Sequence, residues 1–311
     1  MNSTPMYRVA AVQAMTPLLD LERALAAVES WTARAAAEGV KLVVLPETFL
    51  PGYPAWLDVS PGAALWDDTG VKAVHERLLA NAVEVPGPAY ERLASCARTH
   101  RVTLVAGVHE LDGRTLYNSV LTLGPDGALL AHHRKLVPTY SERILWGAGD
   151  GAGLVAPEVD GVRVGSLVCW EHWMPTARQV LHDAGEDVHA ALWPQMKDMN
   201  LVASRHYAFE GRCFVVASGA LLRARDLPAE LPAAGSHGVD DLLLRGGSAV
   251  IAPDGRLLAG PVYDTEALVI ADCDLGEIAR ESMTLDVSGH YSRPDVFTLT
   301  VDRTRRGRIT R

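Results

Sequence analysis

The feature that most constrains the fold is a repeated alternation of continuously apolar strands with amphipathic helices. Residues 19–38 are predicted as a helix with Leu25 and Val28 on one face, and the apolar run 40–48 (VKLVVLPET) follows directly as a predicted strand. Strands without alternating polar positions are typical of a sheet that is covered by other layers. The alternation therefore predicts an α/β fold in which helices lie over the sheets.

The same pattern continues along the chain. Further strands are expected at residues 7–13, 102–110, 162–170, 187–194 and 213–219, and further helices in a segment ending near Arg101 and at 175–184 and 198–211. Two segments, 118–133 and 247–261, share the order serine, apolar strand, Pro-Asp-Gly turn and Leu-Leu-Ala strand, so each is predicted as a β-hairpin. One hairpin in each half of the chain predicts two related sheets packed as layers in one domain.

The charge balance excludes some classes of partner. The 311 residues include 29 Lys+Arg and 38 Asp+Glu, which gives a formal net charge of −9. Nucleic acids and anionic membranes attract a cationic surface, so neither is expected as a partner. No apolar run approaches the ~18 residues of a membrane-spanning helix, and the N-terminus lacks the cationic start of a signal peptide. The sequence is therefore expected to be that of a cytoplasmic protein.

Among the cysteines, only one has a context that indicates reactivity. Four cysteines (Cys96, Cys169, Cys213 and Cys273) are too few for a disulfide scaffold, and none has the CxxC spacing of a zinc site. A free cysteine is most often buried apolar filler. Cys169, however, lies between a predicted strand and a helix beginning near Pro175, where α/β sites are generally built and helix N–H groups lower the pKa of a thiol. Cys169 is predicted to be reactive and the other three to be filler.

Two further segments offer the base and the charge-stabilising group that a nucleophilic thiol requires. Glu47 follows the apolar strand in VVLPETF, where partial desolvation is expected to raise the pKa of its carboxyl group. In HHRKLVPTYSERILWGAGDG, Lys135 ends a strand of the first hairpin and Glu142 follows in a loop. Taken alone, each segment is also compatible with solvated surface charges.

The remaining polar motifs do not indicate a cofactor. The Gly-rich segment 147–153 (GAGDGAG) lacks the GK[ST] ending of a P-loop and the GxGxxG order of a dinucleotide site. His132 and His133 are adjacent on a predicted strand and therefore point to opposite faces, which is unfavourable for a shared metal ion. Neither a cofactor nor a metal is expected.

Together, four segments resemble the nitrilase family of carbon–nitrogen hydrolases, specifically its nitrilase branch. They are LPETFLPGYPAW, HRKLVPTYSERILWGAGDG, CWEHWMPTARQVL and DVSGHYSRPDVF, which occur here in the family's order and spacing. The resemblance implies a four-layer α-β-β-α sandwich with two central mixed sheets. The expected hydrolase domain spans residues 1–283. Residues 284–311 lack helical or alternating periodicity and are predicted as a tail that packs on the surface or on a neighbouring subunit.

The resemblance also assigns roles to individual residues. Glu47 in PETF matches the family's general base, and Cys169 in CWEH matches its nucleophile. Lys135 in HRKLVPT matches the lysine that stabilises the tetrahedral species, and Glu142 in YSER matches a second glutamate that supports the site near the lysine. The backbone N–H of Trp170 would complete an anion hole. The implied reaction converts an organic nitrile into a carboxylic acid and ammonia through a thioimidate and a thioester, without a cofactor.

An amidase or carbamoylase is the alternative function, because these relatives share the Glu, Lys and Cys. Residues 170–172 beside the cysteine resemble the nitrilase branch instead. Six aromatic residues near the ends of the motifs are expected to line a pocket for a hydrophobic nitrile, with core packing as the alternative for each tryptophan: Tyr53, Trp56, Trp146, Trp170, Trp173 and Trp193. The resemblance further implies a homo-oligomer, at least a dimer, while the short segment after residue 297 argues against long spirals.

Overall fold

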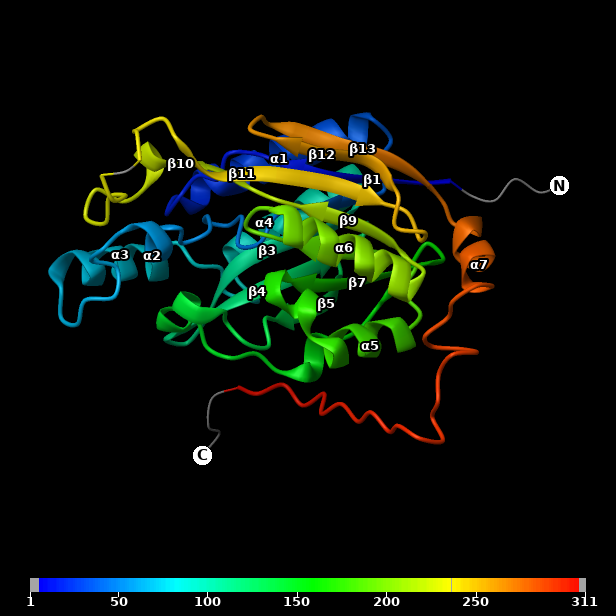
Figure 1. Cartoon of the computed structure of the whole chain (residues 1–311). Helices are drawn as coiled ribbons and strands as arrows, with labels where there is room; N and C mark the ends of the chain where they lie inside the picture. Colours follow the sequence, from blue (N-terminus) through cyan, green and yellow to red (C-terminus); the bar gives the residue numbers. More distant parts are fainter. Residues whose placement is uncertain (1–5, 236, 308–311) are drawn as a thin grey trace.

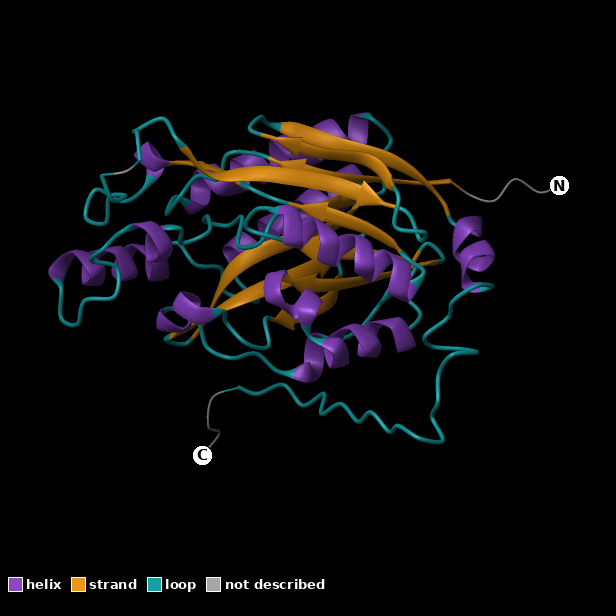
Figure 2. Ribbon diagram, viewed as in Figure 1, coloured by secondary structure: helices purple, strands orange, loops and turns teal. Residues whose placement is uncertain are grey.

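Two mixed β-sheets lie at the centre of the molecule, with helices outside them (Figure 2). The computed structural model describes residues 6–235 and 237–307. The first sheet has the strand order β13 (Ala267–Asp274), β1 (Met6–Gln13), β2 (Leu42–Val44), β3 (Thr103–Asp112), β4 (Thr115–Leu123) and β5 (Leu129–Arg134). The second has the order β10 (Leu221–Arg223), β11 (Leu242–Ile251), β9 (Phe214–Ser218), β8 (Val188–Leu192), β7 (Val162–Val168) and β6 (Glu158–Val159), and β12 (Leu257–Tyr263) pairs with β11.

Some of the described helices cover the outer faces of the two sheets, and others lie at the ends of the molecule (Figure 1). They are α1 (Leu21–Ala37), α2 (Trp56–Val59), α3 (Thr69–Ala80), α4 (Pro88–His100), α5 (Pro175–Asp183), α6 (Asp198–Gly211) and α7 (Gly276–Ser282). Helices α1 and α4 share one apolar core with the first sheet, and α5 and α6 share another with the second sheet. A third core lies between the sheets. The predicted α-β-β-α sandwich with two mixed sheets is confirmed.

The central strands are largely apolar because they have a hydrophobic core on each face. In β1, Ala10 and Val12 pack under α1 and α4, whereas Val9 and Ala11 point into the core between the sheets. Successive side chains of a strand point to opposite faces, so a strand with a core on both sides needs apolar residues at every position. The parallel order β1–β2–β3 is repeated by β7–β8–β9 in the second sheet.

The two predicted hairpins are present, one in each sheet. The first is β4–β5, and the second consists of the end of β11 together with β12. The predicted strand 40–48 is wrong in its extent, because β2 ends at Val44. Pro46 has no N–H for the strand ladder, and the chain turns over residues 47–49. Glu47 was predicted to lie at the end of this strand, but it lies three residues after β2.

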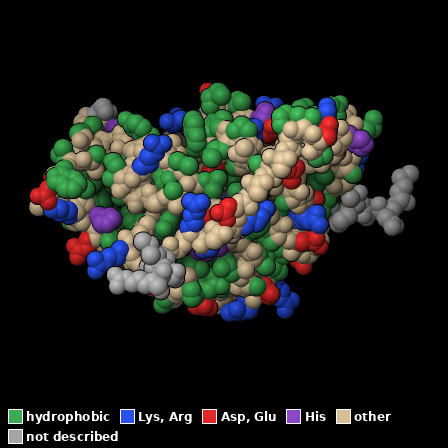
Figure 3. Space-filling view, turned by 90° about the horizontal axis from the view of Figure 1, so that it is seen from below, with side chains coloured by type: hydrophobic (Ala, Val, Ile, Leu, Met, Phe, Trp, Pro, Cys, Tyr) green, Lys and Arg blue, Asp and Glu red, His purple; other side chains and the backbone are tan. Residues whose placement is uncertain are grey.

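The C-terminal segment lies on the surface of the same chain. Residues 283–307 contain neither helix nor strand, and they run along the side of α5 (red, Figure 1). The N–H of Arg306 donates to Asp150 Oδ2 at 2.9 Å, and Arg305 donates to the carbonyl of His132. On this side of the molecule, acidic and basic side chains are interspersed (Figure 3). None of the described helices is long and apolar enough to cross a membrane.

Candidate active site

The four predicted catalytic side chains meet at one point. Cys169 directly follows β7, Lys135 directly follows β5, Glu47 lies in the turn after β2, and Glu142 lies in a 3₁₀ turn over Tyr140–Ile144. One ligand atom each of Glu47, Glu142 and Cys169 lies within 4.8 Å of the others. Segments that are far apart in the sequence are thus brought together at the ends of strands from both sheets.

Lys135 links the two carboxylates. Its Nζ donates to Glu47 Oε1 at 2.8 Å and to Glu142 Oε2 at 2.6 Å, and its side chain is fully buried. Burial disfavours the ammonium, but the charges of Glu47 and Glu142 outweigh this effect and raise the pKa of Lys135. Lys135 therefore remains a cation, fixed in position beside the thiol.

Only one of the two carboxylate oxygens of Glu47 accepts hydrogen bonds from described residues. Oε1 accepts from Asn118 Nδ2 at 2.6 Å and from Lys135 Nζ, whereas the buried Oε2 has no hydrogen-bond partner among the residues that the structure describes. Burial raises the pKa of Glu47 to about 7, against the opposing charge of Lys135. A carboxyl group with a pKa near neutrality and a free oxygen is suited to exchange protons with a neighbouring group.

A glycine in β3 makes room for the turn that carries Glu47. A Cβ atom at Gly107 would lie 2.3 Å from the carbonyl oxygen of Pro46 and 2.6 Å from the nitrogen of Thr48. Any side chain at this position would push the turn away from the sheet. Gly107 therefore allows the Glu47 backbone to lie directly against β3.

Glu142 accepts three hydrogen bonds. Oε2 accepts from Lys135 Nζ and from the N–H of Thr139 at 2.6 Å, and Oε1 accepts from the hydroxyl of Tyr53 at 3.0 Å. These three contacts come from three different segments and hold the carboxyl group in one orientation. Such a group is suited to hold the lysine in place rather than to move a proton.

Cys169 occupies a strained turn and is protonated at rest. Its φ is +50°, and it begins a 3₁₀ turn over Cys169–Trp173. Burial and the carboxylate of Glu47 raise the pKa of the thiol well above its usual value. The prediction that helix N–H groups lower this pKa is wrong in its net direction, because α5 begins only at Pro175 and the N–H of Trp170 opposes the stronger effects. The thiol therefore needs a base.

Glu171 joins the two halves of the site, a role that the sequence did not reveal. Its carboxylate accepts from the N–H of Val168 at 2.8 Å, from the N–H of Leu136 at 2.8 Å and from His133 Nε2 at 2.9 Å. These amides lie next to Cys169 and Lys135 in the chain. One fully buried carboxylate thus fixes the segment of the thiol against the segment of the lysine.

The Gly-rich segment 147–153 is explained by packing. A Cβ atom at Gly149 would lie 2.1 Å from the carbonyl oxygen of Arg134 and 2.6 Å from that of Lys135. The N–H of Gly149 instead donates to the Lys135 carbonyl at 2.9 Å. Glycine is required here because the segment lies directly on the backbone that positions the lysine.

Two of the six predicted aromatic residues lie beside the lysine. The ring centre of Trp146 is 5.9 Å from Lys135 Nζ, and the ring centres of Tyr53 and Trp146 are 6.2 Å apart. Trp146 Nε1 also donates to His109 Nδ1 at 3.1 Å, which fixes the indole. These contacts place both rings in the wall of the site.

The other four aromatic residues divide into exposed and buried ones. Trp170 is 51% exposed and contacts Trp173, whose ring centre lies 5.3 Å from that of the fully buried Trp193. Trp193 stacks on His172, and its Nε1 donates to Ser204 Oγ at 3.1 Å. Trp56 is buried in the apolar cluster that also contains Tyr53. Whether these rings touch a substrate stays a prediction.

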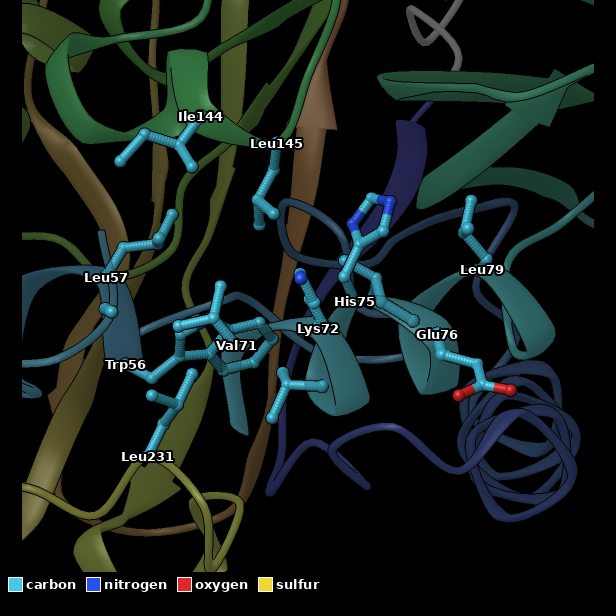
Figure 4. A pocket seen from close by; sticks show the side chains of 13 residues that line it. Trp56, Leu57, Val71, Lys72, His75, Glu76, Leu79, Ile144, Leu145 and Leu231 are labelled. Atoms are coloured by element: carbon cyan, nitrogen blue, oxygen red, sulfur yellow. The ribbon is translucent and has the colours of Figure 1, made fainter. Parts of the chain in front are cut away.

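An apolar cavity adjoins the segments of Glu142 and Tyr53. Its volume is about 390 Å³, and its lining includes Trp56, Ile144, Leu145 and Leu231. Figure 4 shows Ile144 and Leu145, which directly follow the segment of Glu142, facing side chains from α2 and α3. An apolar group held near the site would find space there.

Glu47, Glu142 and Cys169 have the ligand types and the proximity of a possible metal site. The Nζ of Lys135, however, already lies at hydrogen-bond distance from both carboxylates. A metal ion between them would have to displace this ammonium or lie beside its charge. The donor set therefore fits the lysine better than it fits a metal.

An α-β-β-α sandwich that brings a thiol, an ammonium and two carboxylates together has the features of a hydrolase that works through cysteine. The model of the family described as carbon–nitrogen hydrolase matches residues 8–280. The chain belongs to this family, whose members are hydrolases that act on carbon–nitrogen bonds.

Relatives and solved structures agree with this membership. The chain is 40% identical over 305 residues to a bifunctional nitrilase/nitrile hydratase of Nicotiana tabacum, covering 96% of this chain and 87% of that protein. It is 37% identical over 302 residues to Nitrilase 3 of Arabidopsis thaliana, covering 95% and 86%. The fold is similar to that of a carbon–nitrogen hydrolase from Helicobacter pylori, with a TM-score of 0.71 at 17% identity over 94% of this chain and 97% of that one.

Proposed function

We propose that this protein is a nitrilase that hydrolyses an organic nitrile to the carboxylic acid and ammonia. The observation that carries the proposal is the position of the Glu47 carboxylate beside the Cys169 thiol. Lys135 binds Oε1 of this carboxylate, and Oε2 is left without a partner among the described residues. The similarity to plant nitrilases over nearly the whole chain supports a nitrile rather than another carbon–nitrogen bond as the substrate.

In the first half of the reaction, the enzyme forms a covalent intermediate. Glu47 accepts the thiol proton, and the Cys169 sulfur adds to the nitrile carbon. Negative charge develops on the nitrogen, where the Lys135 ammonium and the N–H of Trp170 stabilise it. The proton held by Glu47 then passes to this nitrogen. The product of these steps is a thioimidate.

In the second half, two water molecules are consumed. Glu47 deprotonates the first water, which adds to the thioimidate carbon, and returns this proton to the nitrogen to give an amine. The proton of the new hydroxyl group then passes through Glu47 to the amine, ammonia leaves, and a thioester forms. A second water, activated in the same way, releases the carboxylic acid and regenerates the thiol. Glu142 and Tyr53 act indirectly in both halves, because they hold Lys135 in place.

A panel of nitriles tests the proposal. Aromatic, arylacetic and aliphatic nitriles are offered to the purified enzyme, and ammonia, acid and amide are quantified together. We expect equal amounts of ammonia and acid, with faster turnover of hydrophobic nitriles because the cavity of about 390 Å³ beside the site is largely apolar. The corresponding amides are assayed in parallel. Ammonia from amides but not from nitriles would identify an amidase instead.

We also propose that the protein is a cytoplasmic homo-oligomer. Met199, Val202 and Phe209 project from one face of α6, and each is at least 45% exposed. A second copy of the chain would remove this apolar surface from water. Light scattering after size exclusion is expected to give at least twice the mass of one chain, and substitution of Val202 by glutamate is expected to lower that mass. A native protein with the mass of one chain would contradict the proposal.

A further inference from the structure

A buried chain of hydrogen bonds begins at the backbone carbonyl of Cys169. His172 Nδ1 lies 2.8 Å from this oxygen, and His172 Nε2 lies 3.1 Å from His189 Nε2. His189 Nδ1 lies 2.8 Å from Glu186 Oε2. All three side chains are buried, and none of them has a role in the reaction described above.

The donors and acceptors determine where the protons lie. The Cys169 carbonyl only accepts, so the Nδ1 of His172 carries hydrogen. Burial and the neighbouring His189 lower the pKa of His172 to about 3, so this ring is neutral and its Nε2 accepts. His189 Nε2 must therefore donate.

The far end of the chain is a carboxylate. Burial opposes ionisation of Glu186, but His189 and His182 outweigh it and lower the pKa of this carboxyl group. Its Oε2 lies 2.8 Å from His189 Nδ1. His189 therefore links the Glu186 carboxylate to the neutral ring of His172.

Packing holds Glu186 in one orientation. Its Oε1 accepts from the hydroxyl of Tyr207 and lies 3.3 Å from His182 Nδ1, and His182 in turn lies 3.4 Å from Glu210. A Cβ atom at Gly165 in β7 would lie 1.9 Å from Glu186 Oε2. A glycine at position 165 of β7 thus leaves the space that the Glu186 carboxylate occupies.

The anchored carbonyl belongs to the peptide group whose N–H faces the thiol. In a planar trans peptide, the C=O of Cys169 and the N–H of Trp170 point in opposite directions. The Trp170 N–H acts on the Cys169 thiol as a hydrogen-bond donor that favours its ionised form. A donor on the carbonyl fixes the direction of this N–H and polarises it further.

We propose that Glu186, His189 and His172 form a positioning relay that aims the Trp170 N–H at the thiolate and at the anion formed from the substrate. This proposal rests on the proposed function, in which that N–H is part of the anion hole. The relay connects the buried Glu186 carboxylate to the peptide through two rings that are themselves buried. Its members act through the peptide and do not touch the reacting atoms.

Substitutions at the near end separate the hydrogen bond from the packing. His172→Phe keeps a ring against Trp193 but removes the donor, and we expect kcat to fall about 100-fold with KM within threefold, as for loss of an anion-hole donor. His172→Asn places an amide N–H near the position of Nδ1, so it keeps the bond to the carbonyl but loses His189. It should recover part of the loss, to about tenfold below the native enzyme.

A substitution at the far end tests transmission along the relay. Glu186→Gln leaves His172 in place and should lower kcat about tenfold. The matched control is Glu110→Gln, because Glu110 is also a buried carboxylate but pairs with Arg134 and His132 and contacts no member of the relay, and its kcat should stay within twofold. Thermal unfolding of each variant measures the cost of altering a buried carboxylate.

Alkylation of Cys169 by iodoacetamide gives a readout that needs no nitrile. We expect it to slow several-fold in His172→Phe and Glu186→Gln at a fixed pH, because the Trp170 N–H is no longer held toward the thiolate, and to be unchanged in Glu110→Gln. A native enzyme without nitrile turnover would overturn the proposed function while the alkylation rates still test the relay. Native-like kcat and alkylation in folded Glu186→Gln, or equal losses in Glu110→Gln, would overturn the relay.

Discussion

Replacing Cys169 by alanine is expected to abolish nitrile turnover, with a fall in kcat of ~10⁴-fold or more. The variant cannot form the thioimidate, and the remaining Glu47 and Lys135 can only polarise a nitrile and a water. The loss corresponds to about 5.5 kcal/mol or more of transition-state stabilisation. Ammonia release over several hours, compared with the native enzyme at equal concentration, measures the change. The fold should persist, because only one sulfur atom at the edge of two apolar cores is removed.

Cys213 offers a matched control for this substitution. It is fully buried in the core shared by α5, α6 and the second sheet, and burial raises the pKa of its thiol well above the usual value. Cys213→Ala should lose stability, by about 1 kcal/mol, but keep the native kcat per folded molecule. Turnover by Cys169→Ala within tenfold of the native rate would show that another group is the nucleophile.

The alternation of apolar strands and helices predicted sheets covered by helices, and the two hairpins predicted two packed sheets. The four-layer order was implied by the family resemblance. A strand such as β1, with Val9 and Val12 in different cores, can be recognised in the sequence because residues 9–12 are all apolar. The segment between Pro51 and Asn81 shows no comparable run of apolar residues, and α2 and α3 were not predicted. In hindsight, Val74 and Leu78 have helical spacing and are the buried residues of α3.

Glu47, Lys135 and Cys169 were candidates because each follows a predicted strand, and the resemblance to the nitrilase motifs assigned their roles and that of Glu142. Their partners were not predicted. Asn118 donates to Glu47 across the sheet from the middle of β4, and Glu171 reaches Leu136 from another segment. Such pairs depend on strand order and on the packing of the two sheets, which periodicity does not specify. One local signal was present in the relay, because Glu186 follows His182 by four residues and precedes His189 by three.

The direction of the Cys169 pKa shows the same limit. The sequence placed the thiol near a helix N-terminus, but α5 begins only after a 3₁₀ turn. Burial and the carboxylate of Glu47 therefore raise the pKa of the thiol. Through-space charge and burial therefore decide the ionisation of the thiol. That result makes the base essential rather than auxiliary.

Replacing Glu47 by glutamine is accordingly expected to lower kcat/KM by ~10³-fold. Glutamine keeps the volume and an oxygen that can accept from Asn118 and Lys135, but it has no site for the thiol proton. Glu110→Gln is the matched control, since Glu110 is also a buried carboxylate but pairs with Arg134 and His132 instead. The control should lose stability and retain its turnover per folded molecule. Equal losses of turnover in both variants would point to a general effect of buried charge.

The pH dependence gives the sharper test. Burial raises the pKa of Glu47 to about 7, and only the carboxylate form can accept the thiol proton. In the native enzyme kcat/KM should therefore rise about tenfold per pH unit below this value and level off above it. Lys135 adds no change near neutrality, because its raised pKa keeps it charged. Glu47→Gln should lose the rise. If the rise through about pH 7 remains in that variant, a different group takes the proton, and Glu142 is the nearest carboxylate that could do so.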